Sequence, residues 1–175
     1  MENYLIYTKI PGVLLIKKPT FEDERGFFRE YLKISDLENK ISFNPIQFNH
    51  SRSEENVLRG IHSAPWYKLI YIVKGNVQEV IVDLRSNSKT FKEYISFNLG
   101  EENKMCVLIP PNCGNSFLAL TQTDYIYFTD QYFAPNKETS IRWDDPDINI
   151  NWAVKKPKLS IRDKNNKSIK ELFNI

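Results

Sequence analysis

The chain has few histidines, glycines and cysteines for its 175 residues, and each shortage argues against a class of site. Its two histidines, His50 and His62, are too few for a three-histidine metal centre, and a centre of two histidines and one carboxylate would need both of them. The six glycines are scattered singly, so no glycine-rich phosphate loop is present. We therefore expect no bound metal ion.

The two cysteines, Cys106 and Cys113, and the charge balance bear on the location of the protein. The first residues show no secretory signal, so we expect two reduced thiols and a cytoplasmic location. No apolar run approaches the ~20 residues that span a bilayer, so no membrane partner is expected. The 24 basic and 22 acidic residues leave a formal charge of +2, which argues against a dedicated nucleic-acid binder.

Short stretches rich in Val, Ile, Phe and Tyr recur along the chain, separated by Gly, Pro, Asn and Asp. We predict strands within 13–16, 26–32, 46–51, 68–73, 77–84, 93–99, 105–109, 117–120 and 124–133. Residues 74–76, Lys-Gly-Asn, predict a tight hairpin turn, and helix is expected only in short pieces, such as 34–40 and 166–173. Many short strands with few helical periods predict an all-β sandwich or barrel, in one domain over residues 1–175.

Alternation along the stretch 124–133 assigns its side chains to two faces. Tyr127 and Phe133 are six residues apart, so a continuous strand places them on the same face.

General acid–base catalysis is the chemistry that the composition leaves open, because there is no GxSxG motif and no cysteine signature of a nucleophile. The candidates are His62, Asp163, Tyr127, Lys68 and Arg59. Each also has a structural explanation. The histidine can be a hydrogen-bonded structural residue, the aspartate a turn or helix cap, the tyrosine part of the core, and the two cations residues of a solvated loop.

Several sequence blocks occur in an order that is typical of one family. They are "FEDERGFFREYL", "QFNHSRSEENVLRGIH", "KLIYIVKGNVQEVIVDLRSNSKTF", "IPPNCGNSF", "QYFAPNKETSIRWDDPDININW" and "PKLSIRD". Together they resemble the dTDP-4-dehydrorhamnose 3,5-epimerase family, from about residue 13 to about residue 165. The resemblance implies a cupin-like jelly roll that acts as a homodimer without a metal or an organic cofactor. It also implies inversion of the carbons that flank the C4 ketone of a nucleotide-linked 4-keto sugar.

The resemblance also implies roles for individual residues. His62 matches the base, Asp163 the carboxylate that orients it, Tyr127 the proton donor on the opposite face, and Lys68 the lysine near the ketone oxygen. Substrate-binding roles are implied for Arg59, Gln47, Asn49, Glu138 and Arg162, and for Arg25 and Glu30, which lie on an arm that covers the nucleotide of the neighbouring subunit.

The chain departs from the usual family pattern at three places. Asn115 replaces a histidine that supports substrate binding, Phe133 replaces a tyrosine, and the loop from His62 to Lys68 is shorter. These features resemble a branch that acts on GDP-linked 4-keto heptoses in bacterial capsule synthesis. We therefore predict a GDP-4-keto-heptose 3,5-epimerase. The alternatives are a C3-only epimerase, a dTDP-4-keto-6-deoxyhexose 3,5-epimerase, and a non-catalytic protein that binds sugar nucleotides.

Overall fold

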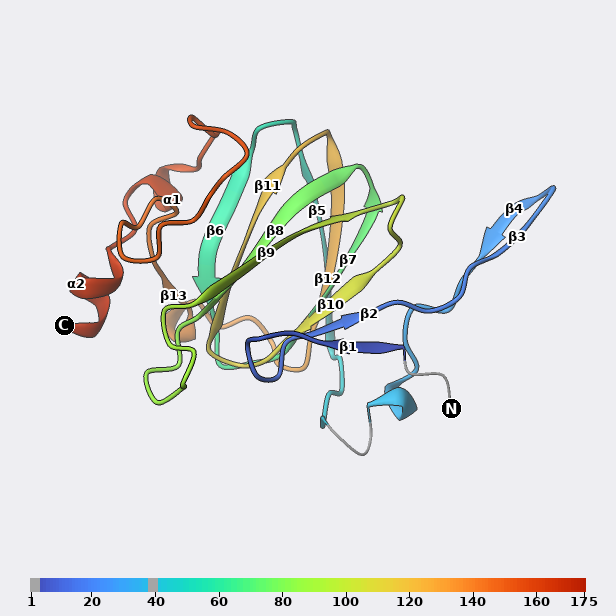
Figure 1. Ribbon diagram of the computed structural model, residues 1–175, viewed down its shortest axis with the longest axis horizontal. Helices are drawn as coiled ribbons and strands as arrows, with labels where there is room; N and C mark the ends of the chain where they lie inside the picture. The colour runs from blue at the N-terminus through green and yellow to red at the C-terminus, as the bar shows by residue number, and fades with distance from the viewer. Residues whose placement is uncertain (1–3, 38–40) are drawn as a thin grey trace.

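Two antiparallel sheets pack face to face in the computed structural model, which describes residues 4–37 and 41–175 (Figure 1). The six-stranded sheet has the order β1 (Leu5–Tyr7), β2 (Leu14–Ile16), β10 (Cys106–Ile109), β7 (Lys68–Lys74), β12 (Thr123–Thr129), β5 (Gln47–Ser53). The five-stranded sheet has the order β13 (Thr139–Ser140), β6 (Leu58–Ser63), β11 (Cys113–Ala119), β8 (Asn76–Asp83), β9 (Tyr94–Gly100). This architecture confirms the predicted all-β, cupin-like jelly roll.

The main hydrophobic core lies between the two sheets. Ile70 and Ile72 of β7 meet Ile81 of β8 and Phe117 of β11, and all four are buried. Strand β8 is buried on both faces, because alternate residues such as Val80 pack on the other side against the C-terminal segment. Strand β8 therefore lies at the centre of the protein, and its residues from Val77 to Asp83 are all buried, polar ones included.

Within the part of the chain that the structure describes, helical structure is limited to four short pieces. They are the 3₁₀ turns η1 (Ile34–Asp36) and η2 (Pro135–Lys137) and the helices α1 (Ile161–Lys164) and α2 (Ile169–Phe173). Helix was expected in both 34–40 and 166–173. The structure shows one 3₁₀ turn in the first, whose residues 38–40 lie outside the described part, and α2 in the second. Within the described residues, no helix is long and apolar enough to cross a membrane.

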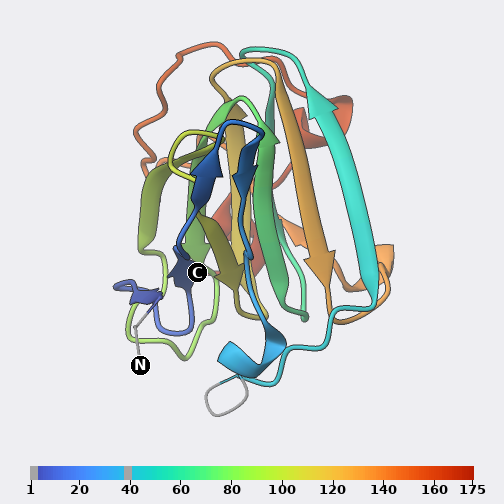
Figure 2. The same ribbon diagram turned by 90° about the vertical axis from the view of Figure 1, so that its right-hand side faces the viewer.

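A two-stranded hairpin of β3 (Phe21–Asp23) and β4 (Gly26–Phe28) projects away from the barrel (Figure 1, right). Its aromatic side chains are left in solvent: Phe21 is 65 % exposed, Phe27 59 % and Phe28 71 %. Turning the structure by 90° shows the long strands of the barrel side by side (Figure 2). The projecting hairpin is therefore an arm with an apolar surface that its own barrel does not cover.

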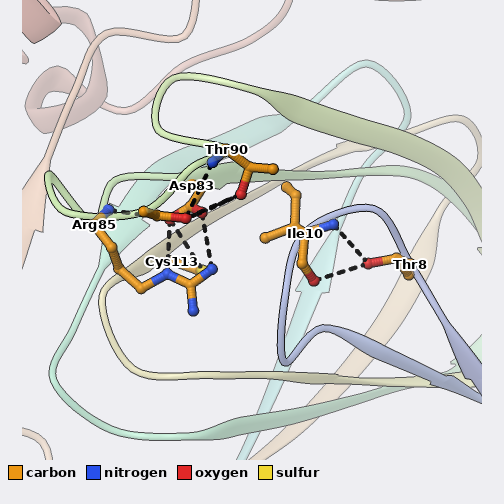
Figure 3. Close-up of polar contacts among 7 residues, drawn as sticks. Thr8, Ile10, Asp83, Arg85, Thr90 and Cys113 are labelled. Atoms are coloured by element: carbon orange, nitrogen blue, oxygen red, sulfur yellow. Dashed lines mark hydrogen bonds and ion pairs between the residues drawn. The ribbon is translucent and has the colours of Figure 1, made fainter.

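The "VDLR" block forms a structural turn at the end of β8 (Figure 3). The buried Asp83 carboxylate accepts hydrogen bonds from Arg85 Nε at 2.7 Å, Ser88 Oγ at 2.6 Å and Thr90 Oγ1 at 2.6 Å. Burial raises the pKa of this carboxyl, but the hydrogen bonds outweigh burial and hold the pKa far below its ordinary value. Asp83 is thus charged at neutral pH and anchors the turn.

The predicted strand over 124–133 is too long. Strand β12 ends at Thr129, so Phe133 lies beyond it. The backbone N–H of Phe133 donates to Gln47 Oε1 at 2.8 Å, and this bond joins the loop after β12 to the start of β5. Tyr127 and Phe133 do line the same cavity, but a loop brings them together, and strand alternation does not.

Candidate active site

A cavity of about 570 Å³ opens between the two sheets, and most of the predicted site residues line it. Those that do are Arg59, His62, Lys68, Asn115, Tyr127, Glu138, Arg162 and Asp163. They come from both sheets and from the C-terminal segment, so the sheet packing assembles the site from distant parts of the chain.

A β-bulge places Arg59 and His62 on the same wall. They are three residues apart on β6, and regular alternation would put them on opposite faces. The pairing with β11 shifts register between them, since Asn115 faces His62 whereas Phe117 faces Arg59. The extra residue in β6 therefore restores both side chains to the cavity side.

Gly60 lies inside this bulge and makes it possible. Its φ of +131° is a conformation that residues with a side chain rarely adopt. A Cβ atom there would lie 2.5 Å from the Cβ of Ser116 on the neighbouring strand. The glycine of "RGIH" is thus required by the backbone geometry that brings Arg59 and His62 to the cavity.

The His62 ring is held by Asp163. Its Nε2 lies 2.7 Å from Asp163 Oδ1, and the two side chains are 23 % and 5 % exposed. Burial raises the pKa of the Asp163 carboxyl, but its bond to His62 outweighs burial and the pKa lies below its ordinary value. An ionised Asp163 accepts a hydrogen bond from Nε2–H, so the lone pair of the neutral His62 ring is on Nδ1, which can act as a base.

The C-terminal segment delivers Asp163 to this position. The backbone N–H of Leu58 donates to the carbonyl of Lys158 at 2.9 Å, which joins the segment to the start of β6. The Ser160 hydroxyl then accepts from the Asp163 backbone N–H at 3.0 Å and caps α1. Asp163 is therefore not a helix cap, because Ser160 caps α1, and its carboxylate faces His62.

Tyr127 approaches the cavity from the opposite wall. It lies on β12 of the six-stranded sheet, whereas His62 lies on β6 of the five-stranded sheet. Burial raises the pKa of its hydroxyl, and the nearby Glu138 carboxylate adds to the effect. The hydroxyl is therefore held in its protonated, proton-donating form.

Lys68 begins β7 and is only 9 % exposed, so the explanation as a solvated loop residue is wrong for it. Its Nζ donates to Asn115 Oδ1 at 2.8 Å. Burial lowers the pKa of Lys68 to about 8, against the opposing effect of Glu138 and Glu79. An ammonium with little water around it interacts strongly with a negative charge that forms beside it.

Further cations line the cavity. Arg59 lies on a strand, not in a loop, and its Nε donates to Ser53 Oγ at 2.9 Å. Arg162 contacts the Glu138 carboxylate, and Lys158, from the same C-terminal segment as Arg162, also lines the cavity. A group of cations around one cavity suits the oxygens of a diphosphate.

Four predicted residues lie outside the main cavity. Gln47 lines a small adjoining cavity with Lys68 and Tyr127, and its amide nitrogen donates to Asn49 Oδ1 at 2.9 Å. The amide nitrogen of Asn49 is buried and makes no hydrogen bond in the described part of the chain.

Arg25 and Glu30 lie apart from the cavity of their own chain. Arg25 is at the tip of the arm, where its guanidinium binds Asp23. Glu30 contacts Lys18 and lies 3.0 Å from Lys33 Nζ. Their assignment to the substrate of a neighbouring subunit stays a prediction.

Similarity to known proteins decides the family. Residues 7–171 match the family described as dTDP-4-dehydrorhamnose 3,5-epimerase. This chain belongs to that family. A dTDP-4-dehydrorhamnose 3,5-epimerase of Shigella flexneri is 38 % identical over 170 residues, which are 92 % of this chain and 93 % of that protein. The Methanothermobacter thermautotrophicus enzyme of the same name is 34 % identical over 178 residues, with 97 % and 96 % covered.

Solved structures support the same assignment. A Legionella pneumophila dTDP-6-deoxy-D-glucose-3,5-epimerase in complex with dTDP-4-keto-L-rhamnose is 33 % identical, with a TM-score of 0.90 over 95 % of this chain and 92 % of that one. A 3′-monoepimerase of Streptomyces bikiniensis in complex with dTDP-quinovose is 27 % identical, with a TM-score of 0.90 over 95 % and 89 %. The chain is therefore an epimerase, an isomerase as predicted.

The described part of the epimerase contains no set of side chains that could bind a metal ion. No group of three or more His, Cys, Asp or Glu residues there could hold a metal ion. The two histidines lie apart, since His50 binds Asp124 at 2.9 Å on a different strand from His62. Both cysteines are free and buried, and burial raises the pKa of each thiol to about 12.

The structure adds residues to the site that were not predicted from the sequence. Tyr125 and Ser51 line the cavity, and Tyr125 OH lies 3.2 Å from the Glu79 carboxylate. The signal for Glu79 was present, because strand alternation puts this acid on the same face as the apolar residues Val77 and Ile81. Burial raises the pKa of its carboxyl to about 8.

Proposed function

We propose that this epimerase inverts both carbons that flank the C4 ketone of a dTDP-linked 4-keto-6-deoxyhexose. The observation that supports this most is the arrangement of His62 and Tyr127 on facing sheets of one cavity, which Lys68 also lines. The names of the family and of its solved relatives support the dTDP-linked substrate over the predicted GDP-heptose.

The proposed reaction begins with removal of a proton beside the ketone. His62 Nδ1 takes the proton, and the electron pair of the broken C–H bond forms an enolate whose negative charge lies on the C4 oxygen. The ammonium of Lys68 stabilises that oxygen electrostatically. Asp163 stabilises the imidazolium that His62 becomes.

Inversion is complete when a proton returns from the other side of the sugar ring. Tyr127 donates that proton, and the enolate collapses back to the ketone with the new configuration at carbon. Exchange of protons with water then restores both His62 and Tyr127. No electron is gained or lost, so the reaction needs no redox cofactor.

The nucleotide is assigned to the rim of the cavity. Arg59, Lys158 and Arg162 carry the positive charge that a diphosphate requires. The arm residues Arg25 and Glu30 are assigned to the nucleotide of a partner subunit, which makes the active unit a homodimer. The exposed aromatic side chains of the arm support this pairing, since contact with a second copy would remove them from water.

A GDP-linked 4-keto heptose is a second candidate substrate, favoured by two features of this chain. Asn115 stands where the family pattern has a histidine, and it binds Lys68 directly. The loop between His62 and Lys68 is short, and Trp66 within it borders the small adjoining cavity. Inversion at C3 alone is a further alternative, because a 3′-monoepimerase has the same fold.

One experiment separates these candidates. The protein is incubated in deuterated water with a dTDP-4-keto-6-deoxyhexose or a GDP-4-keto-heptose, and proton NMR follows C3 and C5. We expect deuterium at both carbons of the dTDP sugar, and the His62→Asn variant is the control for uncatalysed exchange. Turnover of the GDP sugar alone would favour the second candidate, exchange at C3 alone a monoepimerase, and no exchange with either sugar a binding protein.

A further inference from the structure

A chain of buried polar groups runs from the cavity into the core of the barrel. Lys68 Nζ donates to Asn115 Oδ1 at 2.8 Å, Asn115 Nδ2 donates to Tyr125 OH at 3.5 Å, and Tyr125 OH donates to Glu79 Oε2 at 3.2 Å. Glu79 is fully buried and Tyr125 is 3 % exposed. The chain therefore connects a solvent-accessible site to an acid that water does not reach.

The direction of these bonds fixes the Asn115 amide. The hydroxyl of Tyr125 gives its only proton to Glu79, so toward Asn115 it can only accept. Asn115 must then present its NH₂ group to Tyr125 and its oxygen to Lys68. A reversed amide would point its NH₂ group at the Lys68 ammonium, and two donors would face each other. Glu79 therefore determines, through Tyr125, that Asn115 presents its oxygen to Lys68.

We propose that Glu79 and Tyr125 are positioning residues that hold Lys68 in place, and in its charged form, through the amide of Asn115. This inference rests on the proposed function for the use of that charge, since an enolate beside the cavity needs an ammonium and not an amine. Neither positioning residue needs to touch the sugar, because the effect passes through Asn115.

The charges around Lys68 show why Glu79 matters. Glu138 and Arg162 also face the ammonium, from the segments after β12 and in α1, but they contact each other and their fields oppose at Lys68. Glu79 faces it from β8 and has no cationic partner of its own among the described residues. As an acid it is neutral, and as a carboxylate it is an uncompensated negative charge in a medium of low dielectric constant.

The two groups titrate in the same range, so each affects the other. Burial brings the pKa of both Glu79 and Lys68 to about 8. As the pH rises through this range, loss of the Glu79 proton creates the negative charge that keeps Lys68 protonated. Without Glu79 the ammonium would lose its proton at lower pH.

The test measures Lys68 directly. The ε-carbon of lysine is labelled with ¹³C, the Lys68 signal is assigned by its loss in Lys68→Met, and its chemical shift is followed against pH. In Glu79→Gln, which keeps the shape and loses the charge, we expect the midpoint to fall by about one pH unit, the usual size of a shift caused by a neighbouring group. Glu93→Gln, which removes a carboxylate from a surface pair with Lys9, is the matched control and should leave the midpoint unchanged.

Tyr125→Phe provides a second measurement that does not require Glu79→Gln to fold. The Tyr125 hydroxyl favours the charged form of Glu79, so its loss delays ionisation of the acid and should also lower the Lys68 midpoint. In both variants the alkaline limb of kcat/KM should move to lower pH with the midpoint. An unchanged Lys68 midpoint in whichever of the two variants folds would overturn the inference.

The titration tests the positioning of Lys68, and the turnover assay tests the proposed function, so the two proposals can be refuted independently. The Lys68 midpoint is measured on the free protein, so it tests the positioning whether or not either sugar nucleotide is a substrate. If the midpoint falls but no sugar is turned over, the proposed function is wrong and the positioning stands. If turnover is normal and the midpoint does not move, only the positioning is wrong.

Discussion

His62 and Asp163 lie 101 residues apart in the sequence, yet Nε2 of one is 2.7 Å from Oδ1 of the other. His62 is the proposed base, so its substitution by Asn should abolish deuterium uptake at every carbon from which the histidine removes a proton. General-base groups contribute ~10²–10⁴-fold, so the loss should be at least of that order. Asp163→Asn should also slow exchange, because the imidazolium would lose its charged partner. Proton NMR in deuterated water measures both, and near-normal exchange in His62→Asn would remove it as the base.

Tyr127 should separate exchange from inversion. Its position on the sheet opposite His62 predicts that Tyr127→Phe still takes up deuterium but forms ~10²–10⁴-fold less inverted product. NMR of the quenched reaction distinguishes the starting sugar, its labelled form and the product. An equal loss of exchange and inversion, or undiminished inversion, would exclude Tyr127 as the proton donor.

The arm should contribute to the site of a second subunit. Light scattering should show a dimer, and Arg25→Ala should raise KM by ~10–100-fold with little change in kcat, since a hydrogen bond to a charged group contributes ~1.5–3 kcal/mol. Arg142→Ala is the matched control, because Arg142 also binds an aspartate two residues away on the surface. A fully active monomer at assay concentration would contradict the assignment of the arm.

The Asp83 turn predicts a dependence of stability on pH. Asp83→Asn should lower the free energy of unfolding by about 2–3 kcal/mol at neutral pH, because the hydrogen bonds lose their charge. Asp144→Asn, whose aspartate pairs with Arg142 in the same way but in solvent, should cost about 0–1 kcal/mol. The folded-state pKa of Asp83 is depressed, so its contribution is present above the unfolded pKa of about 3.9 and is lost as pH falls toward the folded value. Urea unfolding at pH 7 and pH 3 should show the gap between the wild type and Asp83→Asn narrowing, and a constant gap would refute the linkage.

Metal should not be required. Prolonged treatment with a chelator should leave kcat unchanged, and elemental analysis should find no metal in stoichiometric amount. Activity that vanishes with the chelator and returns with one particular divalent ion would show that this expectation is wrong.

The sequence was sufficient for most of the long strands, and the order of the sequence blocks was sufficient for most of the predicted site residues that line the cavity. It did not predict β6, the strand that carries Arg59 and His62. It was insufficient wherever the geometry depends on a neighbouring strand. Alternation alone would separate Arg59 from His62, and only the shifted pairing with β11 reunites them. The end of β12 at Thr129 depends likewise on a bend that no local pattern showed.

Buried charge was the other property that could not be predicted locally. From the sequence alone Lys68 could be a solvated loop residue, but the packing of the sheets buries it. Glu79 was visible as an acid between Val77 and Ile81 on one face of a strand, yet its link to Lys68 requires Asn115 and Tyr125, from two further strands. Such a chain of contacts exists only after the barrel has closed.

The bond between His62 Nε2 and Asp163 has a consequence for the timing of the proposed double inversion. Because Nε2 is bonded to the carboxylate, only Nδ1 can accept a proton from the sugar. His62 must therefore lose that proton before it can deprotonate a second carbon. Its side chain is 23 % exposed, which gives water a route to collect that proton. Hydrogen atoms removed from the first carbon are thus lost to the solvent pool before the second is attacked, and the sugar leaves with two hydrogens that both originate from water.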